Sequence, residues 1–171
     1  MSWHKIETHE LMAFYPIQIQ IIAVGKLRQS LWQAAAQEYI DRLQRYATVE
    51  IREVKDSLGR GKSEKEAMEE EAREISTRLQ PQAWKVVLDK NGKKFSSEEF
   101  AAIIKEEIEN GRRVCQFVIG GPAGLAPSVI KEANLRLSFS EMTFPHEMAR
   151  VVLLEQLYRA FTILRSEKYH R

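Results

Sequence analysis

Apolar and polar residues alternate along this chain with two different periods, one typical of strands and one typical of helices. Strand-like apolar runs occur at 17–24, 48–54, 86–89, 114–119 and 135–139. Segments with helical spacing follow them at 31–43, 63–79, 97–110, 127–134 and 146–165. Strands that alternate with helices in this way predict an α/β fold with a mainly parallel sheet and helices on both faces.

Residues at the element ends support these boundaries. Ser30 and Ser97 stand where N-caps are expected, and Ser63 with Glu66 forms the capping-box pattern that opens a helix. Gly111 follows the third helical segment and fits the left-handed position beyond a helix end. We therefore expect helices that begin and end close to these residues.

Three polar features complete the pattern. The segment 55–62 contains two glycines and little to bury, which predicts a mobile loop. Asn91-Gly92 is a strong signal for a tight turn. The second helical segment carries a group of glutamates that predict a solvated outer face, and their charge would repel a phosphate backbone. These residues are Glu64, Glu69, Glu70, Glu71 and Glu74.

Size and composition narrow the class of protein. A chain of 171 residues fits one domain, and 44% hydrophobic with 29% charged residues is the composition of a soluble globular protein. No stretch approaches the roughly 18 uncharged apolar residues that span a bilayer, and the N-terminus lacks a secretory pattern. We therefore expect a cytoplasmic protein without a membrane partner. The net charge of +2 is too small to predict nucleic-acid binding, so any RNA site must be a local patch.

The single cysteine, Cys115, stands inside an apolar run. That setting favours a small buried hydrophobic residue, because a catalytic thiol needs a polarising neighbour and none is near in sequence.

A glycine-rich loop, Gly120-Gly121-Pro122-Ala123-Gly124, joins the fourth strand-like run to the next helix. Ligands bind at such strand ends in open α/β sheets. The loop matches neither the phosphate-binding P-loop nor the dinucleotide fingerprint. Its glycines permit close backbone approach, and Pro122 removes a donor, so the loop favours a shaped, uncharged contact. A plain strand-to-helix turn without a ligand is the alternative.

The segment 142–146 and the last helix carry further chemistry. Met142 and Phe144 are either core residues or an apolar wall, and His146 either caps the helix or acts at a site where the helix N-terminus keeps it neutral. The helix beyond is apolar almost all round, which predicts burial on two sides, one of them against a second copy of the chain. Glu155 and Arg159 form an i,i+4 pair whose simplest role is a surface salt bridge.

The C-terminal end is basic and aromatic. Its positive residues are Arg150, Arg159, Arg165, Lys168 and Arg171. Tyr169 adds a ring that can stack on an unpaired base. Such an end is either a frayed terminus or an RNA contact.

Taken in order and spacing, the glycine loop, the segment 137–146 and the terminal Tyr169-His170-Arg171 resemble the ribosomal RNA large subunit methyltransferase H family. These are small SPOUT methyltransferases that methylate N3 of a pseudouridine in large-subunit ribosomal RNA. The resemblance runs from Ile17 to Arg171, so 17–171 is expected to be a single SPOUT domain and 1–16 an N-terminal extension without an assigned role. It implies an α/β knot of the deep trefoil type and a homodimer whose active sites are completed across the interface.

The resemblance also implies the cofactor and its pocket. The cofactor would be S-adenosylmethionine, and no metal is expected. The residues that correspond to the family's cofactor pocket are Leu88, Gly120, Phe139, Ser140, Glu141, Met142, Thr143 and Phe144.

Methylation of an imino nitrogen requires a proton acceptor. His170 is the first candidate, with His146 and Glu155 behind it, and Tyr169 can stack on the target base. The candidates for holding phosphates or a uracil carbonyl are Arg150 and Arg171, and further RNA contacts are expected from Arg159 and Lys168.

The substrate implied by the resemblance is the helix 69 stem-loop of 23S ribosomal RNA, presented by an assembled large subunit or 70S ribosome. Two alternatives stay open. One is a SPOUT methyltransferase that acts on transfer RNA, and the other is a noncatalytic, ribosome-associated RNA-binding dimer. Binding of S-adenosylmethionine would separate the second alternative from both enzymes.

Overall fold

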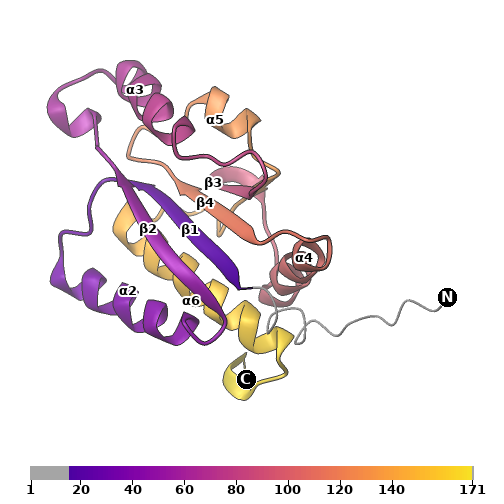
Figure 1. Cartoon of the computed structure of the whole chain (residues 1–171). Helices are drawn as coiled ribbons and strands as arrows, with labels where there is room; N and C mark the ends of the chain where they lie inside the picture. The colour runs from indigo at the N-terminus through magenta and orange to yellow at the C-terminus, as the bar shows by residue number, and fades with distance from the viewer. Residues whose placement is uncertain (1–15, 171) are drawn as a thin grey trace.

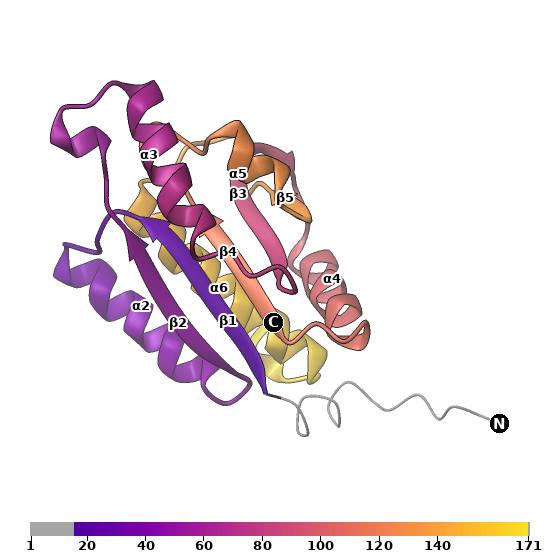
Figure 2. The same cartoon turned by 45° about the horizontal axis from the view of Figure 1, so that its top comes forward.

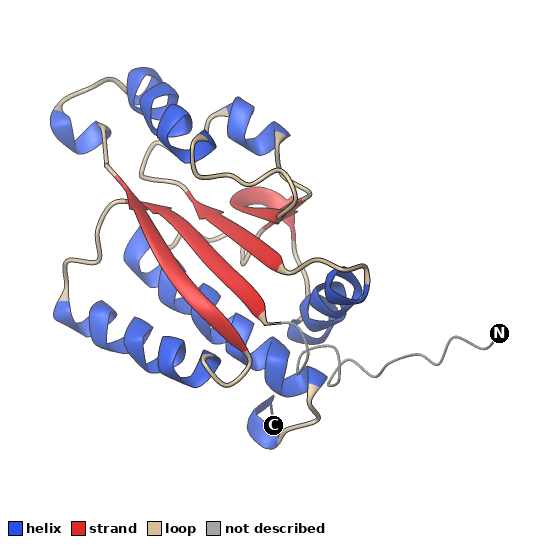
Figure 3. Cartoon of the chain, in the orientation of Figure 1, coloured by secondary structure: helices blue, strands red, loops and turns tan. Residues whose placement is uncertain are grey.

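A parallel β-sheet organises residues 16–170, which are the part of the chain described by this computed structural model; side chains are described through Tyr169. Its strands are β1 (Ile17–Val24), β2 (Ala47–Val54), β3 (Trp84–Lys93), β4 (Val114–Ile119) and β5 (Leu135–Leu137). They lie in the order β2-β1-β4-β3-β5, and every neighbouring pair is parallel (Figure 3). The predicted α/β fold with a parallel sheet is therefore confirmed.

Helices cover both faces of this sheet (Figures 1 and 2). One layer holds α2 (Ser30–Leu43), α4 (Ser97–Glu109) and α6 (His146–Leu164), and the other holds α3 (Glu64–Ser76) and α5 (Pro127–Lys131). The central strand β1 contributes to two separate cores, because Ile19 and Ile21 pack with the first layer while Ile22 and Val24 pack with the second. A strand buried on both faces needs an apolar run, and the second half of β1, 21–24, is one.

The last helix, α6, lies between α2 and α4 and packs against both. Leu153, Leu157 and Phe161 are buried in the core between these helices and the sheet. Two neighbouring helices and a sheet account for most of the apolar surface that the sequence analysis divided between the sheet and a second copy. Val151 and Val152 are left half-buried, so the homodimer stays a prediction.

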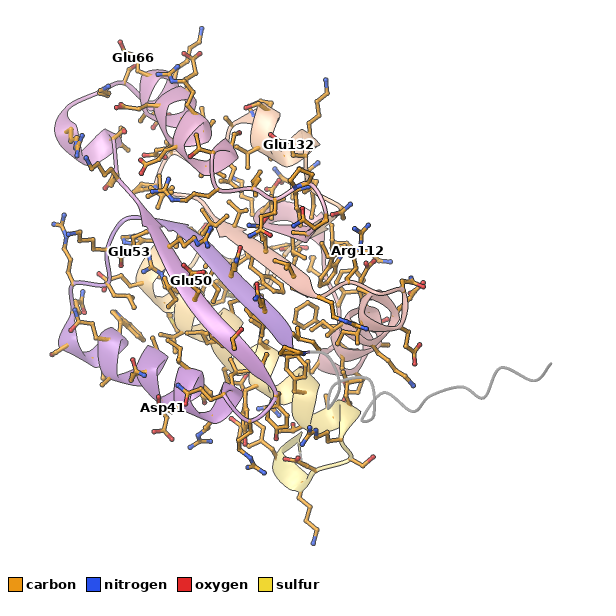
Figure 4. The ribbon with its side chains drawn as sticks, viewed as in Figure 1. Asp41, Glu50, Glu53, Glu66, Arg112 and Glu132 are labelled. Carbon is orange, nitrogen blue, oxygen red and sulfur yellow. The ribbon has the colours of Figure 1, made fainter. Side chains whose placement is uncertain are left out.

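Two of the predicted helix-end motifs are present. Ser63 accepts a hydrogen bond from the backbone N–H of Glu66, whose carboxylate accepts from the N–H of Ser63, at the start of α3 (Figure 4). Gly111 has a φ of 89° and follows the end of α4.

Two predicted N-caps were wrong by one residue. Ser30 is the first residue of α2, and Gln29 occupies the cap position without a side-chain bond. Ser96, not Ser97, caps α4, because Ser96 exchanges capping-box hydrogen bonds with Glu99. In the second case two adjacent serines offered the same chemistry, and only Ser96 has the glutamate three residues later.

Asn91-Gly92 does not form the predicted turn. Both residues lie within β3, where the pairing with β5 shifts register between Leu88 and Lys93. A Cβ at Gly92 would lie 2.7 Å from the backbone of Arg136, so the glycine permits close approach of two strands at this bulge.

The segment 55–62 is more tightly bonded than predicted. It contains the short 3₁₀ helix η1 (Leu58–Arg60), and its Ser57 is buried with its N–H donated to Glu71 at 2.9 Å. Glu71 is itself only 2% exposed, so its assignment to a solvated outer face was wrong. The helical stripe at 3.6 residues per turn places Glu71 beside Ala72 and Ile75 on the inner face of α3.

The trefoil knot stays a prediction of the family resemblance. Residues 1–15 of the predicted N-terminal extension and Arg171 lie outside the described residues.

Candidate functional site

A cavity of about 850 Å³ opens at the carboxyl ends of β3, β4 and β5. Its walls come from Leu88, the last residue of β3 that pairs with β4, from the glycine loop 120–124 after β4, and from the segment 137–146 that joins β5 to α6. These segments are far apart in sequence and meet because parallel strands end at the same edge of the sheet. The volume lies within the range of about 300–1,000 Å³ found for pockets that bind cofactor-sized ligands.

The glycine loop forms a tight turn. Gly124 has a φ of 85° and donates its N–H to the carbonyl of Gly121 at 2.9 Å. A Cβ at Gly120 would lie 3.0 Å from the backbone carbon of Gly124 and from the Leu125 side chain. Only glycine leaves this space open, so the backbone of the loop can contact a ligand.

The segment opposite the glycine loop is braced by its own side chains. The hydroxyl of Ser138 donates to the carbonyl of Ser140 at 3.0 Å, and the hydroxyl of Ser140 accepts from the N–H of Met142 at 3.0 Å. Phe139 and Phe144 pack edge to face with ring centroids 6.5 Å apart. This wall is therefore apolar and preformed.

The structure brings together almost all of the residues that the resemblance assigns to the cofactor. The cavity is lined by Leu88, Gly120, Phe139, Ser140, Met142, Thr143 and Phe144. Glu141 does not line it, because its exposed carboxylate pairs with Lys94 at the end of β3. Glu141 therefore ties the loop to the sheet from outside the cavity.

Three charged residues of the cavity wall, Asp89, Lys90 and Arg136, were missed by the sequence analysis. Arg136 Nη2 lies 2.5 Å from Asp89 Oδ2, and both residues line the cavity. Burial alone would raise the pKa of Asp89, but the N–H of Asn91 and the guanidinium of Arg136 outweigh it and hold the pKa below its ordinary value. Asp89 could have been found, because it is the last residue of the predicted strand 86–89, at the ligand-binding edge. Arg136 lies inside a short strand, and its sequence context gave no signal.

His146 lines the same cavity at the start of α6 and lies against Gly25 at the end of β1. One turn further along α6, Arg150 is fully buried. Its guanidinium donates to Glu53 Oε1 at 3.1 Å and to the carbonyl of Gly25 at 3.0 Å, which links α6 to the ends of β1 and β2 (Figure 4 labels Glu53). Burial lowers the pKa of Arg150. In this arrangement the guanidinium of Arg150 contacts Glu53 and Gly25 of the same chain. It would have to become exposed to contact an RNA phosphate.

The C-terminal tail packs on its own protomer. The Tyr169 hydroxyl donates to Glu155 Oε1 at 3.2 Å and lies 3.3 Å from the Tyr39 hydroxyl. Its ring meets Tyr158 edge to face at 4.7 Å, and the Arg159 guanidinium lies 4.9 Å from the ring centroid. Burial and the bond with Tyr39 raise the pKa of Tyr169. Tyr169 is therefore anchored, not frayed.

The other predicted residues of this end differ in their surroundings. Glu155 accepts from the Arg159 guanidinium at 2.5 Å, and Lys168 is exposed. The side chain of His170 and all of Arg171 lie outside the described residues.

Tyr169 folds back along α6, because its hydroxyl bonds to Glu155, nine residues after His146. At about 1.5 Å per residue, nine residues correspond to about 14 Å along the helix axis. His146 at the cavity and Tyr169 in the tail therefore do not meet at one reacting atom in this arrangement.

Other candidate chemistry is limited. Cys115 is buried, and burial raises the pKa of its thiol to about 12, which confirms a core cysteine. Among the described residues, no three His, Cys, Asp or Glu side chains gather as a metal site. None of the helices formed by residues 16–170 is long and apolar enough to cross a bilayer.

Comparison with known proteins identifies a family. The family model described as "Predicted SPOUT methyltransferase" matches residues 17–170. The SpoU methyltransferase AviRb from Streptomyces viridochromogenes aligns with 9% identity and a TM-score of 0.44, over 89% of this chain and 61% of that one. The structure of AviRb in complex with AdoMet aligns with 11% identity and a TM-score of 0.41, over 90% of this chain and 59% of that one. The chain thus spans about three fifths of these structures, and the similarity is too low to transfer the role of any residue.

Proposed function

The chain belongs to the SPOUT methyltransferase family, and we propose that it transfers a methyl group from S-adenosylmethionine to N3 of a pseudouridine in 23S ribosomal RNA. The observation that carries the proposal is the single cavity formed by the glycine loop and the segment 137–146. The substrate comes from the resemblance of these segments and of the terminal Tyr169-His170-Arg171 to the ribosomal RNA large subunit methyltransferase H family.

The cavity fits this cofactor. Its glycine loop and apolar wall present backbone groups and rings to the uncharged nucleoside, and a side chain at Gly120 would press against Gly124 and Leu125, which line the same cavity. When bound, S-adenosylmethionine supplies an activated methyl group on its sulfonium. The part left to the protein is to hold both reactants in line and to accept the N3 proton.

In this proposal Leu88, Gly120 and the loop 139–144 hold the cofactor, and Glu141 fixes that loop through Lys94. His146 is the titratable ring that lines the cavity from the same chain, whereas His170 belongs to the tail. Arg159, Lys168 and Arg171 supply positive charge for the RNA backbone.

The separation of cavity and tail favours a homodimer. Tyr169 is held at Glu155, about 14 Å along α6 from His146, so in this arrangement the tail does not reach its own cavity and would act at the cavity of a second copy, which completes each site across the interface. Mixing two inactive variants tests this, one with Gly120→Val and one lacking residues 169–171. Random pairing gives half heterodimers with one intact site each, so activity should return to about a quarter of the wild-type level. Absence of recovery in a mixture shown to exchange subunits would refute the composite site.

The substrate is tested in cells. Mass spectrometry of 23S RNA from a deletion strain should show loss of one methyl group at a pseudouridine in helix 69, restored by the wild-type gene. Assembled large subunits or 70S ribosomes should serve as substrates in vitro, and the reaction then belongs to the cytoplasm. If a transfer RNA loses the methyl group instead, the alternative SPOUT activity is correct.

A further inference from the structure

The charged side chains of the cavity wall gather at one end. Asp89 and Lys90 follow Leu88 in β3, and Arg136 belongs to the neighbouring β5. The glycine loop and the lining part of the segment 137–144 carry no charge. The cavity therefore has a neutral part and a charged part with a net charge of about +1.

Within the charged part, Arg136 and Asp89 form a fixed pair. Arg136 Nε and Nη2 lie 3.2 and 2.5 Å from Asp89 Oδ2, while Asp89 Oδ1 accepts the N–H of Asn91 at 3.0 Å. The Asp89 side chain is 14% exposed and that of Arg136 is 46% exposed. The carboxylate is thus held on both oxygens, and the guanidinium is the accessible member of the pair.

Most of the hydrogen-bonding capacity of Arg136 is unused. A guanidinium has five N–H donors, of which Asp89 takes two. The other donors have no partner among the described residues. A planar cation with free parallel donors recognises a carboxylate in two-point contact.

We propose that Arg136, positioned by Asp89, binds the α-carboxylate of S-adenosylmethionine. The cofactor carries this one carboxylate, on the amino-acid end remote from its uncharged adenine. A cavity with one neutral and one cationic part therefore fixes the direction in which the cofactor lies, with the nucleoside at the glycine loop and the amino acid at β3 and β5. This inference rests on the proposed use of S-adenosylmethionine.

Calorimetry with two ligands tests it. Decarboxylated S-adenosylmethionine keeps the sulfonium, the amine and the nucleoside and lacks only the carboxylate. Wild-type protein should bind S-adenosylmethionine at least about tenfold more tightly than the decarboxylated ligand, and Arg136→Gln should abolish this preference by weakening the intact cofactor alone. Arg73→Gln, which removes an exposed cation on α3, should leave both affinities unchanged.

The positioning role of Asp89 has its own readout. Asp89→Asn loosens the guanidinium without removing it, so the preference for the intact cofactor should fall by a smaller factor than in Arg136→Gln. A merely structural role would weaken both ligands equally and leave their ratio unchanged.

Other results would overturn the assignment. Equal weakening of both ligands by Arg136→Gln assigns the residue to general folding of the cavity. Unchanged affinities with slower methylation of ribosomes assign Arg136 to the RNA. If the wild-type protein binds neither ligand, the proposed function itself fails.

Discussion

The imidazole of His146 lies directly against Gly25: a Cβ on the glycine would come within 3.1 Å of His146 Nε2. Gly25 has a φ of 86°, and its carbonyl accepts from Arg150, one turn beyond His146. The end of β1 and the first turn of α6 thus form one packed unit beside the cavity. The glycine provides both the backbone conformation and the space that this packing needs.

Gly25→Ala should therefore do two things. Alanine in this left-handed conformation should lower the free energy of unfolding by about 1–2 kcal/mol. Its methyl group should also displace the His146 ring. We expect an altered imidazole signal by NMR and slower methyl transfer.

Gly61→Ala is the matched control. Gly61 has a φ of 80°, and nothing lies within 4 Å of its Cβ position. It should show the same backbone cost with an unchanged imidazole signal and unchanged activity. Equal activity of the two variants would mean that the position of His146 does not matter for the reaction.

Gly120→Val should abolish cofactor binding. A Cβ there would already lie 3.0 Å from the backbone of Gly124 and from the Leu125 side chain, so the larger valine should distort the turn that lines the cavity. Calorimetry should detect no S-adenosylmethionine binding in a protein with wild-type circular dichroism. Gly111→Ala, a left-handed glycine with nothing within 4 Å of its Cβ position, controls for a general loss of stability. Retained binding in a folded Gly120→Val protein would move the pocket elsewhere.

Arg150→Gln separates a structural role from RNA contact. Loss of the guanidinium removes the donor to the Gly25 carbonyl and leaves the Glu53 carboxylate with only the N–H of Leu27 among the described residues, which should cost about 1.5–3 kcal/mol in urea unfolding. Arg52→Gln removes an exposed pair with Glu50 on the same strand and should cost at most about 1 kcal/mol. Wild-type stability of Arg150→Gln with lost methylation would instead assign Arg150 to the substrate.

The sequence predicted the strands well because β1 and β4 are mostly apolar and β2 alternates apolar and polar residues, whereas several site features depend on contacts between distant segments. Asp89 meets Arg136 only because β3 and β5 are neighbours. The burial of Glu71 was missed for the same reason, because it depends on contact with the loop that covers it. The glycine loop could be identified because its residues 120–124 are consecutive in the sequence.

The apolar surface of helix α6 can be buried by neighbouring helices or by a second copy of the chain. Its nearly uniform apolar surface predicts burial on more than one side, and two helices of the same chain supply much of that burial. Periodicity does not distinguish a neighbouring helix from a second copy. A sedimentation measurement at micromolar concentration does, and a monomer would refute the composite site.

Glu71→Gln should stabilise the protein at neutral and alkaline pH. Burial raises the pKa of Glu71 from its ordinary value of 4.5, and its buried Oε2 has no hydrogen-bond partner among residues 16–170. The folded state therefore holds the proton more tightly than the unfolded state, so stability falls as pH rises above 4.5 and levels off above the raised pKa. The advantage of Gln, measured as Tm, should vanish near pH 4.

Its neighbour Glu70 gives the opposite sign. The bond with Lys62 lowers the pKa of Glu70, so its contribution is present above its ordinary pKa and is lost as pH falls through the lowered value. Glu70→Gln should lower Tm at neutral pH. If Glu71→Gln also lowers Tm at pH 8, the buried carboxylate is better satisfied than its contacts indicate.

Removal of residues 169–171 should separate cofactor binding from RNA methylation. Tyr169 is anchored by Glu155, Tyr39 and Tyr158, so its loss should lower Tm, unlike the loss of a frayed end. The cavity, whose lining does not include Tyr169, should bind S-adenosylmethionine as in the parent. Methylation of ribosomes should slow at least tenfold, which corresponds to about 1.4 kcal/mol of transition-state stabilisation.

Tyr169→Phe is the control for this truncation, because it keeps the ring against Tyr158 and removes only the hydroxyl bonds to Glu155 and Tyr39. If the ring stacks on the target base, Tyr169→Phe should retain most of the activity that the truncation loses. Single-turnover rates on assembled large subunits measure both variants. Full activity of the truncated protein would show that the tail takes no part in the reaction. A group inside the cavity must then accept the proton, and His146 is the residue to replace next.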